Sequence, residues 1–111
     1  MTAGQRPLQM TPSEVAALRA ANPDLAILDV REAWEVEICA IPGSRNIPMG
    51  QVPNRMAEVP EGDPLVVVCH HGGRSLQVTQ FLRSRGVDRA INLAGGVDGW
   101  AREVDPAMAR Y

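Results

Sequence analysis

One cysteine stands where an apolar run meets a glycine-bearing loop, and this is where the chain could do chemistry. The run 65–68 leads directly into Cys69. Between this cysteine and a predicted helix over 75–85 lie five residues: His70, His71, Gly72, Gly73 and Arg74. A cysteine in such a strand-to-helix turn faces loop N–H groups and the positive end of the following helix. That setting favours a thiolate with an anion beside it, as sulfur transfer or phosphoryl transfer through cysteine requires.

The loop residues have the types that such a site needs. Gly72 and Gly73 let the backbone curl so that its N–H groups point inward. Arg74 offers a fixed cation with a fork of donors, and Ser75 can cap the helix. We therefore expect an electropositive, partly exposed setting in which Cys69 is largely a thiolate at neutral pH. Without these neighbours, a cysteine closing a valine-rich strand would as often be a small buried hydrophobe.

Three other residues could take part in the chemistry. Asp29 and Arg31 could be catalytic partners of Cys69, but we favour a role in bracing the loops at the strand ends, because a buried charge needs a partner. Cys39 could be a resolving thiol for Cys69, but a free cysteine is more commonly a small apolar filler.

The sequence does not favour a metal site or a resident cofactor. Neither cysteine belongs to a C-x-x-C pair. Cys69, His70 and His71 are adjacent, and we expect adjacent side chains to diverge rather than to converge on one tetrahedral ion. Near the carboxyl end, Gly95 and Gly96 could line a site, but a tight turn is the favoured interpretation.

Strands and helices are predicted to alternate along the chain. Strands are expected over 8–10, 25–30, 45–47, 65–68 and 90–93, and helices over 11–21, 32–38, 51–58, 75–85 and from about 95 onward. The first helix has Thr11 as N-cap, Pro12 at the first position and Glu14 closing a capping box. This order predicts an α/β fold whose five-stranded, mostly parallel sheet is flanked by helices. Ligands bind such sheets at the carboxyl ends of strands, where Cys69 lies.

Length and composition narrow the function classes. The 111 residues suit one domain over 1–111, and 45% hydrophobic with 22% charged residues is typical of a globular protein. A net charge of −2 gives no general attraction to nucleic acid or membranes. No apolar run approaches the roughly 18 residues of a membrane span, and the stretch 1–7 lacks an apolar signal region. A cytoplasmic location is the resulting expectation.

Four blocks of the sequence resemble signatures of the rhodanese-like sulfurtransferase family. The loop reads C-x-x-G-x-R-S, with four residues between Cys69 and Arg74, and the related loop of cysteine phosphatases is one residue longer. The other blocks are LDVRE with WE over 28–35, IPGS with NIP over 41–48, and NLAGGVDGW over 92–100. Ala40 stands where the family often has histidine, at a position that looks structural.

The resemblance implies a three-layer rhodanese-like fold and a defined chemistry. Cys69 would attack a small anionic donor such as thiosulfate and carry its sulfur as a persulfide to cyanide, a thiol or a protein acceptor. Donor binding would fall to the residues His70, His71, Gly72, Gly73, Arg74 and Ser75, with Asp29 and Arg31 in support. For His70 and His71, tuning the charge of the site and facing water as solvated loop residues are equally open. The alternatives are a module that carries sulfur or binds a partner without catalysis and, disfavoured by the short loop, a cysteine-loop phosphatase.

Overall fold

Five parallel strands form one sheet at the centre of the structure, a computed structural model that describes residues 6–111. The strands are β1 (Gln9–Met10), β2 (Ala26–Asp29), β3 (Arg45–Asn46), β4 (Leu65–Val68) and β5 (Ala90–Leu93). They lie in the order β1-β5-β4-β2-β3, and every pairing is parallel. The predicted parallel sheet is therefore confirmed. The expectation about a signal region concerns residues 1–7, of which 1–5 lie outside the described residues.

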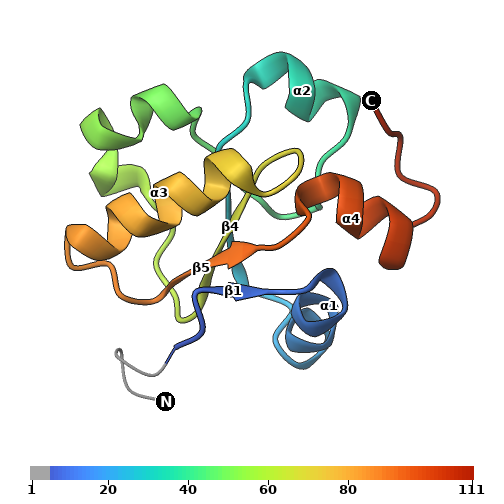
Figure 1. Ribbon diagram of the computed structural model, residues 1–111, viewed down its shortest axis with the longest axis horizontal. Coiled ribbons are helices and arrows are strands. Elements are labelled where there is room, and N and C mark those ends of the chain that lie inside the picture. Colours follow the sequence, from blue (N-terminus) through green and yellow to red (C-terminus); the bar gives the residue numbers. More distant parts are fainter. Residues whose placement is uncertain (1–5) are drawn as a thin grey trace.

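Helices cover both faces of this sheet (Figure 1). One face packs against α1 (Pro12–Ala21) and α4 (Gly96–Glu103), and the other against α3 (Gly73–Ser84) and the 3₁₀ helix η2 (Met49–Asn54). The short helix α2 (Ala33–Ile38) follows β2, and the carboxyl end of the chain returns to lie beside it (Figure 1). The three layers match the rhodanese-like architecture that the resemblance implied.

The central strand β4 explains why the cysteine loop, residues 69–75, has a fixed position. All four of its residues are buried, with exposed fractions of 1% or less. Leu65 and Val67 pack in the α3-side core, while Val66 and Val68 pack in the core under α1 and α4. Burying each such side chain contributes about 1.5–3 kcal/mol. The strand is thus anchored on both faces up to the residue before Cys69.

Several predicted element bounds differ from the structure by one or two residues, one predicted helix and one predicted cap are wrong, and one capping prediction holds. The helix expected over 51–58 is two 3₁₀ segments, η2 and η3 (Met56–Glu58). Since η2 begins at Met49, an α-helical hydrogen bond would run from residue 53 to residue 49, and Pro53 has no N–H to donate. Helix α3 begins at Gly73, with Gly72 as its N-cap at φ +104°, so Ser75 is not the cap. The strand predicted over 25–30 is shorter, as Ala26–Asp29. The capping box of Thr11 and Glu14 is confirmed. Within residues 6–111, no helix has the length and apolar character needed to cross a membrane.

Candidate functional site

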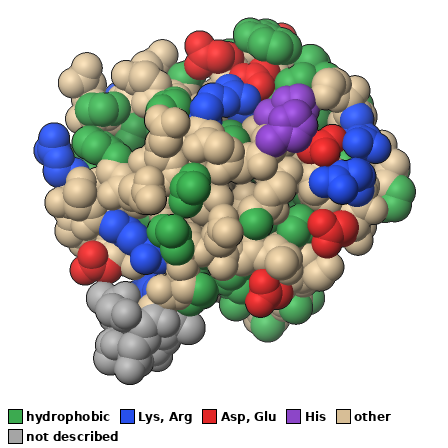
Figure 2. Space-filling model, in the orientation of Figure 1, with side chains coloured by type: hydrophobic (Ala, Val, Ile, Leu, Met, Phe, Trp, Pro, Cys, Tyr) green, Lys and Arg blue, Asp and Glu red, His purple; other side chains and the backbone are tan. Residues whose placement is uncertain are grey.

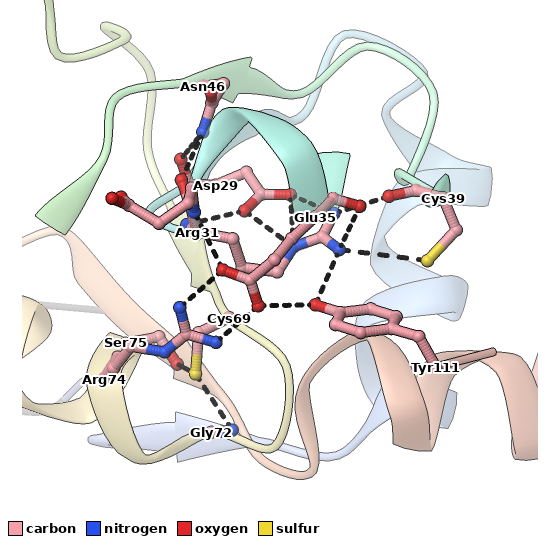
Figure 3. A network of polar contacts seen from close by, with 11 residues as sticks. Asp29, Arg31, Glu35, Cys39, Asn46, Cys69, Gly72, Arg74, Ser75 and Tyr111 are labelled. Carbon is pink, nitrogen blue, oxygen red and sulfur yellow. Dashed lines mark hydrogen bonds and ion pairs between the residues drawn. The ribbon is translucent and has the colours of Figure 1, made fainter. Parts of the chain in front are cut away.

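Cys69 lies at the carboxyl end of β4, in the loop that begins α3 (Figure 3). Its Sγ atom accepts a hydrogen bond from the N–H of Gly72 at 3.1 Å. The Oγ atom of Ser75, in the first turn of α3, lies 3.2 Å from the same sulfur. The sulfur therefore sits where the loop and the start of the helix meet, as the sequence predicted.

The cysteine is more deeply buried than the sequence suggested. Cys69 is 1% exposed and belongs to the core cluster on the α3 side of the sheet. The expected partly exposed setting is wrong for this conformation of the loop. Any reacting sulfur has to enter the loop to reach Sγ.

Ser75 contacts Cys69 and also a residue that the sequence analysis did not single out. Its Oγ lies 2.5 Å from Oδ1 of Asn92, which is 1% exposed. The Nδ2 group of Asn92 donates to the carbonyl of Gly72 at 3.2 Å and to Oε1 of Gln9 at 3.3 Å. Asn92 thereby joins β5 to the cysteine loop through polar contacts.

The start of α4 is docked on the backbone of the cysteine loop. The N–H of Val97 donates to the carbonyl of Cys69 at 2.9 Å, and that of Asp98 donates to the carbonyl of His70 at 3.1 Å. A Cβ atom on Gly96 would lie only 2.4 Å from each of these two carbonyl oxygens. Gly96 is therefore needed for this close approach and also for its φ of +59°, beyond the tight turn that the sequence suggested.

Arg74 is engaged by a carboxylate that sequence reasoning missed. Its two terminal nitrogens donate to the two oxygens of Glu35 in α2, each at 2.8 Å. The hydrogen bonds from Arg74 hold the pKa of Glu35 down at about 2, although burial of this carboxyl works in the opposite direction. The same pairing raises the pKa of Arg74. The charge of Arg74 is thus largely offset by Glu35, a substantial change from the free cation that the loop pattern suggested.

Asp29 and Arg31 form a buried ion pair behind the loop. Nη2 of Arg31 lies 2.7 Å from Oδ2 of Asp29, and both side chains are at most 1% exposed. Arg31 also donates to the carbonyls of Glu35 and Cys39. The pair thereby links the end of β2 to both the interior and the end of α2 (Figure 3).

Tyr111 completes this polar network from the far end of the sequence (Figure 3). Its hydroxyl donates to Oε1 of Glu35 at 2.8 Å and accepts from Nη1 of Arg31 at 3.1 Å. Its ring stacks on His70 with centroids 3.9 Å apart and planes 7° apart, and it meets Trp34 edge-on at 6.0 Å. No motif in the sequence pointed to Tyr111.

The two histidines lie together at the rim of the loop, where Figure 2 shows them as one surface patch between acidic and basic side chains. Their rings stack at 3.9 Å, so the expectation that adjacent side chains diverge is wrong for this pair. Burial is the main cause that lowers the pKa of His70 below its usual 6.5. His70 is therefore favoured as a neutral group at neutral pH, and His71 is exposed.

His70, His71 and Asp98 also have ligand atoms within 4.8 Å of one another. Their arrangement is nevertheless poor for a shared metal ion. The lone pairs of an imidazole lie in the ring plane, and these two planes are stacked only 26° apart. Asp98 already pairs with Arg102 and Arg110. The geometry thus favours a stacked histidine pair over a coordination site.

Cys39 lies at the end of α2, and its polar contact is with Arg31 rather than with Cys69. Its Sγ is 3.8 Å from Nη1 of Arg31, and the residue packs partly buried against the core under α1 and α4. It also borders a narrow crevice with His70, Asp98, Arg110 and Tyr111. These contacts are those of a packing residue next to the Arg31 network.

Comparison with known proteins shows which family this chain resembles in sequence. The rhodanese-like domain model matches residues 11–103. A sulfurtransferase of Allochromatium vinosum is 36% identical over 98 residues, covering 87% of this chain and 92% of that protein. The putative sulfur carrier protein YrkF of Bacillus subtilis is 35% identical over 85 residues, and there the match spans 77% of this chain but 46% of the relative.

A solved structure supports the same assignment at the level of the fold. The human single-domain sulfurtransferase TSTD1 superposes with a TM-score of 0.75 at 29% identity, over 88% of this chain and 98% of that one. The family model, the two relatives and the solved structure all agree with the four signature blocks, one of which is the cysteine loop at the end of β4. The chain belongs to the rhodanese-like family, among relatives named as sulfurtransferases.

Proposed function

We propose that this protein moves a sulfane sulfur from a donor such as thiosulfate to a thiophilic acceptor through a persulfide on Cys69. The observation that carries the proposal is the position of its Sγ, beside the Gly72 N–H and the first turn of α3. Backbone N–H groups at a helix start stabilise a sulfur anion without a full counter-charge. The names of the relatives support transfer of sulfur by such a site.

The reaction divides into two balanced steps. The Cys69 thiolate attacks the outer sulfur of thiosulfate, the S–S bond of the donor breaks, and sulfite leaves with its electron pair. Cyanide or a thiol then attacks the outer persulfide sulfur, and the Cys69 thiolate is restored, which gives a ping-pong cycle. The N–H groups of residues 70–75 would bind the donor and the charge of the departing sulfite.

Other site residues receive proposed roles in the same scheme. Arg74, held by Glu35, would fix the side of the loop that the donor enters, and His70 and His71 would border that entrance. The buried pair of Asp29 and Arg31 would support α2 and the loop. A single rhodanese-like domain over 1–111 and a cytoplasmic location, where thiols stay reduced, belong to this proposal.

Intact mass after incubation with thiosulfate tests the proposal directly. One added sulfur, about 32 Da, is expected as the mark of the covalent intermediate. The adduct should be absent in Cys69→Ser, kept in Cys39→Ser, and removed by cyanide with release of thiocyanate. No uptake of sulfur from thiosulfate or from persulfide donors would sink the enzyme proposal.

A sulfur carrier is the second candidate, favoured by the similarity to YrkF. A carrier would also form the adduct, but it would pass sulfur to a protein acceptor and leave cyanide almost unreacted. The rate of thiocyanate release therefore separates the two. Hydrolysis of a small aryl phosphate would instead support the phosphatase alternative.

A further inference from the structure

The hydroxyl group of Ser75 has one proton and two neighbours that could receive it. Its Oγ lies 2.5 Å from Asn92 Oδ1 and 3.2 Å from Cys69 Sγ. A hydroxyl is a single donor with two acceptor lone pairs. Ser75 can therefore donate to Asn92 or to Cys69, but not to both at once.

The orientation of the Asn92 amide decides this competition. Its Nδ2 lies 3.2 Å from the carbonyl oxygen of Gly72, a group that can only accept a hydrogen bond. Turning the amide over would place two acceptors against each other, so Oδ1 must face Ser75. Asn92 is 1% exposed, and a buried acceptor without a donor is costly. The Ser75 proton is thus drawn toward Asn92.

We infer that Asn92 is a positioning residue for Cys69 that acts through the hydroxyl of Ser75. With its proton on Asn92, Ser75 turns a lone pair toward Sγ and can accept the S–H of the protonated cysteine. When that thiol proton leaves to solvent, the lone pair faces a thiolate. Ser75 then has to rotate its own proton from Oδ1 to Sγ, which leaves Asn92 without a donor. Asn92 therefore favours the protonated, less reactive form of Cys69.

The charged and titratable groups around the loop are the same in both arrangements. They are Arg74 in α3 with its partner Glu35 in α2, His70 and His71 in the loop, Asp98 in α4, Tyr111 at the carboxyl end of the chain, and the buried pair of Asp29 and Arg31 at the end of β2. Asn92 touches the thiol by a second route as well, because its Nδ2 donates to the carbonyl of Gly72, whose N–H donates to Sγ. The test therefore has to separate the Ser75 proton from this backbone contact.

The test measures the pH dependence of alkylation at Cys69, followed on the Cys69 peptide by mass spectrometry. Asn92→Leu keeps the forked shape of asparagine but has no acceptor, so Ser75 is free to donate to the thiolate. The pH at which the alkylation rate is half its maximum should fall by about one unit. At any pH well below this midpoint, the variant should then hold about tenfold more thiolate than wild type. Asn92→Ala is the second variant and has the same expected direction.

A double-mutant cycle with Ser75→Ala separates this role from a general effect on packing. If Asn92 acts through Ser75, the Asn92 substitution should cause no further shift in the Ser75→Ala background. Gln9→Ala is the matched control, because it removes the other acceptor of Nδ2 while Gly72 still fixes the amide. It should leave the midpoint unchanged.

An unchanged or higher midpoint in a folded Asn92 variant would overturn the inference, as would an additive shift in the double mutant. If neither Asn92 variant folds, the wild-type side-chain amide signal of Asn92 in an NMR titration decides. That signal should move with the alkylation midpoint, and a signal that stays constant overturns the inference.

The inference rests on Cys69 as the proposed nucleophile, yet no readout needs sulfur transfer. A missing sulfur adduct with a shifted midpoint would therefore reject the proposed function alone.

Discussion

At the scale of single residues, the pairing of Arg74 with Glu35 has the largest consequence for the choice of donor. The loop pattern indicated a free cation next to Cys69, but two 2.8 Å hydrogen bonds tie that cation to a buried carboxylate. A dianion such as thiosulfate, the proposed donor, would meet a nearly neutral pair in this part of the site. Backbone N–H groups would then have to supply most of its binding.

Neutralising Glu35 should therefore improve binding of a small anionic donor. Glu35→Gln can still accept one hydrogen bond from Arg74 but leaves its positive charge unbalanced. We expect the KM for thiosulfate to fall by about three- to tenfold, as one partly exposed charge contributes roughly 1 kcal/mol. Steady-state thiocyanate formation measures this change. Glu37→Gln, an equal change of charge at an exposed position of α2, is the control. A KM that rises in Glu35→Gln would contradict the argument.

The same carboxyl predicts how stability depends on acid. The pKa of Glu35 is lowered from 4.5 to about 2 in the folded protein, mainly by Arg74. The carboxylate therefore stabilises the fold fully above the unfolded value of about 4.5, and this contribution is lost as the pH falls toward 2. Thermal unfolding between these pH values should show a smaller loss of Tm in Glu35→Gln than in wild type. Parallel curves for the two proteins would argue against the pairing.

At the scale of elements, the tight contact between α4 and the cysteine loop makes Gly96 a sensitive position. A methyl group there would lie 2.4 Å from the carbonyl oxygens of Cys69 and His70, on a residue whose φ is +59°. Gly96→Ala should cost about 3 kcal/mol of unfolding free energy through overpacking and backbone strain. It should also slow formation of the Cys69 adduct, since the loop has to move.

Gly73→Ala is the matched control for that substitution. Gly73 begins α3, a Cβ atom there would meet nothing within 4 Å, and its φ is not positive. The free energy of unfolding of Gly73→Ala, measured by urea denaturation, should stay within about 0.5 kcal/mol of the wild-type value. Equal losses in the two variants would mean that the α4 contact is not the cause.

The elements themselves were largely predictable because their signals are local. The capping box of Thr11 and Glu14, the apolar run 65–68 and the alternation of strands and helices all act within a few residues. The start of α3 was misplaced because Gly72 takes the cap position through a left-handed φ that sequence alone does not reveal. Contacts across long separations were missed as well. Glu35 meets Arg74 over 39 residues, and Asn92 meets Ser75 because β5 pairs Asn92 with Val67 in β4.

At the scale of the whole molecule, the segment after α4 contacts the candidate site, although it lies outside the four signature blocks. The family match ends at residue 103, whereas Tyr111 joins Glu35, Arg31 and His70. Arg110 also pairs with Asp98 at 3.0 Å. This last stretch therefore connects α2, the cysteine loop and α4, and it can set the environment of His70 from a distance in sequence.

Removing the Tyr111 ring should change the titration of His70 in a defined direction. Burial is the first cause of the low pKa of His70, and the Tyr111 ring covers one face of this imidazole at 3.9 Å. In Tyr111→Ala that pKa should rise toward 6.5, because the imidazolium regains contact with water. Tyr111→Phe keeps the stack and should leave the pKa of His70 low, although it loses the hydroxyl contacts to Glu35 and Arg31.

Trp34→Ala serves as the control, since Trp34 meets the edge of Tyr111 rather than His70. NMR titration of the imidazole protons measures all four proteins, and an unchanged His70 in Tyr111→Ala would show that other groups cover the ring.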